Sequence, residues 1–79
     1  MFSLHLTVCG RVIDPTEHES LADLGDVLAR ELRDAGMGLK PRVISILLSL
    51  ISNDLRTRLT WTWDAEDYQI FVARDGPDL

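Results

Sequence analysis

The side chains best suited to catalysis are one cysteine, Cys9, and two histidines, His5 and His18. A cysteine nucleophile needs a histidine within hydrogen-bond reach and a third group that orients that histidine. His5 precedes Cys9 by four residues, roughly 13 Å along an extended strand, which is beyond that reach. His18 belongs to a separate acidic segment. We therefore expect Cys9 to be a small structural residue and predict that the chain is not an enzyme.

Metal and cofactor chemistry is equally weak in the sequence. His5 and Cys9 share a strand face but lie too far apart along it to hold one ion. The Gly-Met-Gly segment 36–38 lacks the GxxxxGK[ST] pattern of a phosphate-binding loop, so a helix cap is the better interpretation. Among the many carboxylates only Asp54 projects toward apolar neighbours, and a role at a helix end explains it better than acid–base catalysis. The sequence predicts no catalytic residue, no metal ligand and no cofactor.

Length and composition describe an ordinary small globular protein. The 79 residues, of which 46% are hydrophobic and 27% charged, suit one domain over 1–79, near the lower limit of independent folding. A single cysteine excludes an internal disulfide framework and fits a reducing compartment. The first ten residues lack the features of a signal peptide, and the longest apolar run is about half of the roughly 20 residues that span a bilayer. We expect a cytoplasmic protein whose residues 76–79 are frayed.

The net charge of −5 bears on the partner. An acidic chain is repelled by nucleic-acid phosphates and by anionic membranes, so we expect direct binding to neither, and a basic protein as the favoured partner. A purely solubilising role is the common alternative. The carboxylates predicted to face a partner lie before and after the apolar centre of the chain: Glu19, Asp23, Asp26, Glu31, Asp34, Asp64, Glu66 and Asp67.

The N-terminal residues alternate between apolar and polar, which predicts one strand over residues 2–12. Its core face would carry Phe2, Leu4, Leu6, Val8 and Val12, and Gly10 would mark a bulge. A helix should follow, starting at Asp14, Thr16 or Ser20. We favour the last two because the apolar period begins only at Leu21.

A second helix is predicted from Pro41 to Arg56. Its polar residues recur at intervals of three and four and form one stripe, while its apolar residues cover roughly 200°. One side (Ile44, Leu47, Leu48, Ile51 and Leu55) can pack on a sheet. The other side consists of Val43, Ile46 and Leu50 and must meet the first helix or a partner. If the first helix leaves it open, we expect a helix–helix homodimer.

The last third of the chain predicts a β-hairpin. A loop of two or of four residues gives the same register, with Trp63 opposite Tyr68, Trp61 opposite Ile70 and Leu59 opposite Val72, all on the core face. Phe71 falls on the opposite, more polar face and is the candidate for an exposed anchor on the sheet.

These elements predict an α+β fold of order β-α-α-β-β: a three-stranded antiparallel sheet with both helices packed on one face. Two functions fit it. The first is an inhibitor or adaptor that docks an acidic surface on a basic protein, including one that binds nucleic acid; phage-encoded anti-CRISPR inhibitors are analogous in size and charge only. The second is a homodimerising structural or regulatory subunit, such as an antitoxin-like accessory protein.

Overall fold

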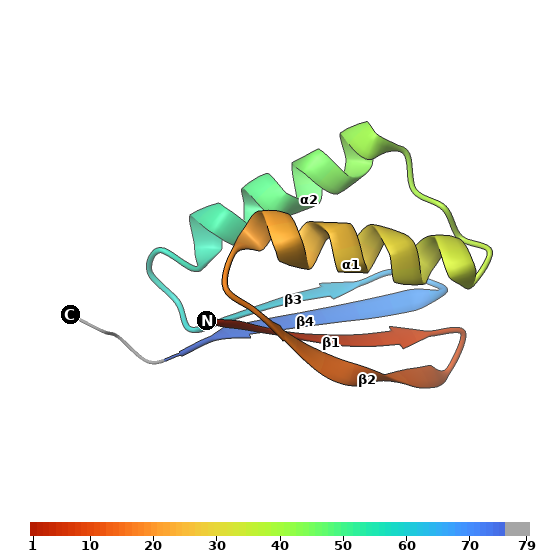
Figure 1. Cartoon of the computed structure of the whole chain (residues 1–79), viewed down its shortest axis with the longest axis horizontal. Helices are drawn as coiled ribbons and strands as arrows, with labels where there is room; N and C mark the ends of the chain where they lie inside the picture. Colours follow the sequence, from red (N-terminus) through yellow and green to blue (C-terminus); the bar gives the residue numbers. More distant parts are fainter. Residues whose placement is uncertain (76–79) are drawn as a thin grey trace.

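The computed structural model describes residues 1–75 and consists of two layers, a four-stranded antiparallel sheet and two helices that cover one of its faces (Figure 1). The elements are β1 (Phe2–Val8), β2 (Arg11–His18), α1 (Leu21–Asp34), α2 (Pro41–Asp54), β3 (Thr60–Asp64) and β4 (Tyr68–Arg74). The strand order across the sheet is β2-β1-β4-β3. The predicted α+β class is confirmed, whereas the three-stranded β-α-α-β-β order is wrong by one strand. Residues 76–79, predicted to be frayed, lie outside the described residues.

The additional strand arises because the chain reverses at Cys9 and Gly10. Both residues have positive φ, 52° and 79°, as the two central positions of a type I′ hairpin turn require. Gly10 is therefore a turn residue and not a bulge. Since the chain turns back here, Val12 lies on the outer face of the sheet with 75% of its surface exposed, and its predicted place in the core is wrong. Cysteine before glycine is an uncommon turn signal compared with asparagine or aspartate.

The second strand forms one edge of the sheet, and its pairing with β1 is irregular. Leu4 pairs with Thr16 and Leu6 with Ile13, so that two residues, Asp14 and Pro15, oppose one residue of β1. Such a bulge bends the strand, and proline within a sheet is confined to edges and bulges because it cannot donate a ladder hydrogen bond. Bulges and prolines also obstruct pairing with another chain, so the β2 edge is protected.

Both ends of α1 follow local rules. Ser20 is the N-cap, and its hydroxyl accepts a hydrogen bond from the Asp23 amide, which decides among the three predicted starts. At the other end Gly36 has φ 84°. The Gly36 amide donates to the Arg33 carbonyl and the Met37 amide to the Leu32 carbonyl, the paired bonds of a Schellman motif. These caps fix the length of α1 over residues 21–34.

The C-terminal hairpin has the predicted faces but a different register. Trp61 pairs with Val72 and Trp63 with Ile70, a shift of two residues from the predicted pairs. The Ala65 amide donates to the Tyr68 carbonyl, so the turn is centred one residue later than predicted. A shift of two keeps every side chain on its face. Leu59, however, precedes the strand and is exposed.

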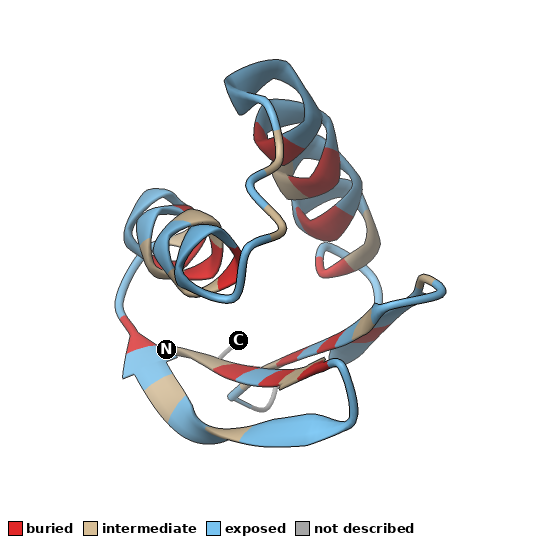
Figure 2. Cartoon of the chain, turned by 90° about the vertical axis from the view of Figure 1, so that its right-hand side faces the viewer, coloured by how far each residue is buried: buried red, intermediate tan, exposed pale blue. Residues whose placement is uncertain are grey.

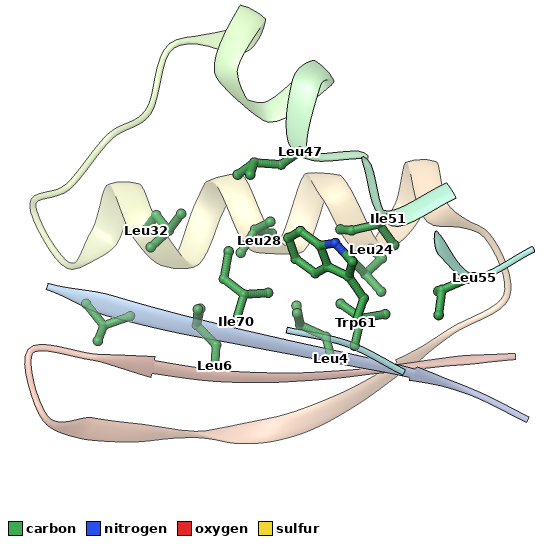
Figure 3. Packing of buried hydrophobic residues seen from close by; sticks show 12 residues of the cluster. Leu4, Leu6, Leu24, Leu28, Leu32, Leu47, Ile51, Leu55, Trp61 and Ile70 are labelled. Atoms are coloured by element: carbon green, nitrogen blue, oxygen red, sulfur yellow. The ribbon is translucent and has the colours of Figure 1, made fainter. Parts of the chain in front are cut away.

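The core lies between the sheet and the two helices. Three leucines of α1 meet side chains of α2 and of the two central strands (Figure 3). Its buried apolar members are Leu4, Leu6, Val8, Leu24, Leu28, Leu32, Leu47, Ile51, Leu55, Trp61, Ile70 and Val72. α1 lies over β1 and β2 while α2 contacts β3. The position of α2 places its far side beyond the reach of α1.

α1 and α2 approach closely at Gly25 of α1. A β-carbon added there would lie 2.5 Å from Cδ1 of Leu48 in α2, so a side chain at this position must displace that leucine. We expect Gly25→Ala to gain about 1 kcal/mol of helix propensity but to lose about 1–3 kcal/mol to overpacking. In a Leu48→Ala background, where the space is free, the same change should stabilise the protein. Urea unfolding of the four variants measures this reversal of sign, and an identical effect in both backgrounds would contradict the close approach.

Candidate interaction surfaces

The apolar side of α2 that faces away from α1 is uncovered. Its residues Val43, Ile46 and Leu50 expose 36%, 53% and 41% of their surface; we call them the α2 stripe. The buried residues of α2 lie on the side toward α1 and the sheet (Figure 2). The sequence predicted that the three residues of the stripe would contact either the first helix or a partner. α1 does leave them open.

The neighbouring strand, β3, forms the second edge of the sheet. The Leu59 carbonyl accepts from the Arg74 amide at 2.9 Å and the Ala65 amide donates to the Tyr68 carbonyl at 2.8 Å. Because residues of an antiparallel strand alternate in the direction of their hydrogen-bonding groups, the odd-numbered residues of β3 bond to β4. The backbone groups of Thr60, Thr62 and Asp64 therefore point away from β4; we call this row the β3 edge.

The two tryptophans of β3 differ in burial. Trp61 is buried in the core, as predicted, whereas Trp63 exposes 37% of its surface, so its predicted place in the core is only partly correct. The indole rings stack with centroids 6.2 Å apart and an interplanar angle of 10°. Trp63 thus adds an exposed aromatic surface to the core side of the strand whose backbone forms the β3 edge.

The predicted acidic surface is divided between the two ends of the molecule. Glu31 and Asp34, at the C-terminal end of α1, line a hollow of about 420 Å³ beside the β1–β2 turn. The Cys9 amide of that turn donates to the Asp67 carbonyl at 2.8 Å, which brings the β3–β4 turn to the same end. We call this group the acidic end: Glu31, Asp34, Asp64, Glu66 and Asp67. One arginine, Arg11, lines the same hollow.

The other acidic candidates lie apart from this group. Glu19 and Asp23 line a second hollow around the start of α1, together with Met1 and Ser20, and Asp26 is exposed farther along α1. The eight predicted residues therefore do not form one continuous surface. The acidic end contains five of them and combines carboxylates from both halves of the sequence.

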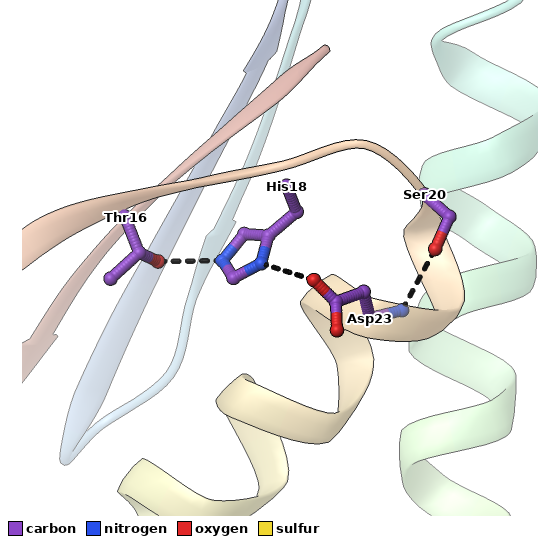
Figure 4. A network of polar contacts seen from close by, with 4 residues as sticks. All are labelled: Thr16, His18, Ser20 and Asp23. Atoms are coloured by element: carbon purple, nitrogen blue, oxygen red, sulfur yellow. Dashed lines mark hydrogen bonds and ion pairs between the residues drawn. The ribbon is translucent and has the colours of Figure 1, made fainter.

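His18, a candidate for catalysis or metal binding, is buried and has a structural role. The sequence placed it in a separate acidic segment, but only 6% of its surface is exposed. Its Nδ1 donates to Asp23 Oδ2 at 3.1 Å, and its Nε2 lies 2.7 Å from Thr16 Oγ1 (Figure 4). Both ring nitrogens are satisfied within this network, which joins the end of β2 to the first turn of α1. Sequence reasoning missed this burial because it did not predict β2, whose last residue is His18.

The remaining candidates lie on the outer face of the sheet, which neither helix covers (Figure 1), or in the β1–β2 turn. Phe71 lies there with 37% of its surface exposed and meets the ring of His5 edge-on, with centroids 5.3 Å apart. Cys9 is exposed in the β1–β2 turn. Within residues 1–75, no three His, Cys, Asp or Glu side chains converge in a way that could hold a metal ion. His5 lies in β1 and Cys9 in the turn that follows it.

No protein-family model, curated protein or solved structure matches this chain. Across the described residues, neither helix has the length and apolar character needed to cross a membrane.

Proposed function

We propose that the chain is a non-enzymatic protein-interaction module that inhibits or adapts a basic protein in the cytoplasm. The observation that supports this function best is the acidic end, where α1 and the β3–β4 turn place five carboxylates around one tip of the fold. The negative end of the α1 macrodipole points the same way. A basic partner surface is attracted by such a field, and the attraction speeds association.

The partner class follows from the chemistry of this tip. Basic protein surfaces commonly bind nucleic-acid phosphates, so a protein that carries an acidic tip can occupy a site meant for a nucleic acid. Inhibitors of the anti-CRISPR kind act on such proteins, and the analogy again extends only to size and charge. The chain itself, with a net charge of −5, is repelled from nucleic acid and from anionic membranes.

Affinity capture from the native host tests this function through a matched pair of charge variants. Asp34→Asn with Asp67→Asn alters the acidic end, and Glu19→Gln with Asp26→Asn removes the same charge elsewhere. We expect a basic protein to bind the wild type and the second variant, and to bind the first variant about tenfold more weakly at low salt. Binding should also fall steeply as salt rises. Salt-insensitive binding, or equal binding by both variants, would contradict an acidic docking surface.

A second function is favoured by a different observation, the open α2 stripe. A homodimerising structural or regulatory subunit, of the antitoxin-like accessory kind, would bury Val43, Ile46 and Leu50 against a second copy. A self-complementary apolar patch closes under two-fold symmetry without any other partner. The α2 stripe and the acidic end are different surfaces, so a dimer formed through the stripe would still present an acidic end on each copy.

A further inference from the structure

We propose that two copies of this chain pair antiparallel along β3, edge to edge, and so join their two four-stranded sheets into one continuous sheet. The α2 helices of the two copies would lie side by side on the same face of that sheet. This inference deepens the second proposed function and rests on it, because it specifies how a homodimer forms. It shares Asp64 and Glu66 with the acidic end, whereas Glu31 and Asp34 of α1 stay outside the β3 edge.

The two edges of the sheet differ in a way that favours β3. The β2 edge carries Pro15 and a bulge, both of which obstruct pairing with another strand. β3 pairs regularly with β4 over residues 60–64 and contains neither proline nor bulge. Its one charged residue, Asp64, stands at its end. A regular unprotected edge is a template for a further strand.

The pattern of free backbone groups defines one symmetric register. Thr60, Thr62 and Asp64 point away from β4, as the bonds of Leu59 and Ala65 show. A two-fold axis perpendicular to the sheet at Thr62 pairs Thr62 with its own copy and Thr60 with Asp64 of the second copy. This register uses all three outward residues and provides about six hydrogen bonds, two for each pair. A two-fold axis at Trp61 or Trp63 would pair only two of these three outward residues with residues of the second β3.

Charge complementarity indicates that the occupant is a second copy. Two exposed arginines, Arg56 and Arg58, precede β3, and acidic Asp64, Glu66 and Asp67 end it or follow it. Antiparallel pairing about Thr62 sets the basic end of one copy beside the acidic end of the other, with Arg58 opposite Glu66. Parallel pairing would place like charges together at both ends, at a cost in free energy. The β3 edge of one copy is therefore complementary in charge to the β3 edge of a second copy.

The apolar surface lies where this dimer needs it. α1 packs against α2 at Leu48, so the α2 stripe faces away from α1, on the β3 side of the molecule. A perpendicular two-fold axis keeps both α2 helices on one face of the sheet, and each stripe then faces its copy across the axis. The exposed indole of Trp63 lies on the same face of β3. Backbone pairing, charge and apolar burial thus agree on one interface.

Sedimentation equilibrium of the full chain tests the proposal with a matched pair of variants. The wild type should have twice the monomer mass, and Thr62→Pro should be monomeric, because proline removes an N–H that the dimer uses. That N–H makes no bond to β4, so Thr62→Pro should keep the circular dichroism spectrum of the wild type. Thr62→Val keeps the N–H and should remain dimeric. Arg58→Glu and Glu66→Arg should each weaken the dimer about tenfold, and the double variant should restore it.

The outcomes distinguish failure of the edge pairing from failure of the homodimer function. A monomeric wild type would overturn both the edge pairing and the homodimer function. If Ile46→Glu abolishes a dimer that Thr62→Pro leaves intact, the copies associate through their helices alone and the edge pairing is wrong, while the homodimer function survives. If Thr62→Pro fails to fold, the charge reversals decide, because failure of the double variant to restore the dimer would contradict the antiparallel register.

Discussion

Replacing Leu28 with alanine is expected to leave much of the protein unfolded at room temperature. Leu28 has 0% of its surface exposed and sits in the middle of α1, between the sheet and α2 (Figure 3). Truncating a buried leucine to alanine costs about 2–5 kcal/mol. A core of this size supplies a net stability of only about 3–5 kcal/mol. Urea unfolding followed by far-UV circular dichroism measures the loss.

The control for this experiment is Val12→Ala. Val12 is an apolar residue of the N-terminal hairpin, but it is mostly exposed on the outer face of the sheet, so truncation should change stability by about 0.5 kcal/mol or less. The comparison also tests the reversal at Cys9 and Gly10. A single strand over residues 2–12 would bury Val12, and a loss similar to that of Leu28→Ala would then contradict the hairpin.

The second large effect is expected at Trp61. Its indole is buried among Leu24, Ile51 and the sheet, and replacing it with alanine should cost about 3–5 kcal/mol. Trp63→Ala should cost the monomer about 1–2 kcal/mol, because that ring is partly exposed and contributes mainly its stacking on Trp61, worth about 0.5–1.5 kcal/mol. Urea unfolding of both variants, at a protein concentration where the chain is monomeric, provides the test. Equal losses would contradict the observed difference in burial between the two rings.

Features that depend on neighbours in the sequence were accessible to prediction. Ser20 caps α1 because its hydroxyl meets an amide three residues later, and Pro41 begins α2 because its fixed φ suits the first turn. The faces of the C-terminal hairpin were correct, although its turn was misplaced by one residue. The reversal at Cys9 was not predicted, since cysteine has no strong preference for positive φ.

Features that depend on strand order were not accessible. The α2 stripe does not depend on strand order, and the spacing of its residues identified it from the sequence, because three-to-four periodicity reports the face of a helix. The β3 edge required knowing that β1 pairs with β4 on the side away from β3, which leaves β3 at an edge of the sheet. The acidic end likewise required the contact between Cys9 and Asp67, which lie in separate hairpins. Such long-range neighbours leave no trace in local periodicity.

The pairing of β1 with β4 at the centre of the sheet has a kinetic consequence. These strands lie more than fifty residues apart in the chain, yet they pair along their whole length, from Phe2 with Arg74 to Val8 with Tyr68. Each hairpin and the helix pair can form from near neighbours, but the central ladder must close a long loop first, and such contacts slow folding. During synthesis, β1 therefore cannot pair with β4 until β4 has left the ribosome. Until then the N-terminal hairpin exposes the unpaired edge of β1 to chaperones and to other nascent chains.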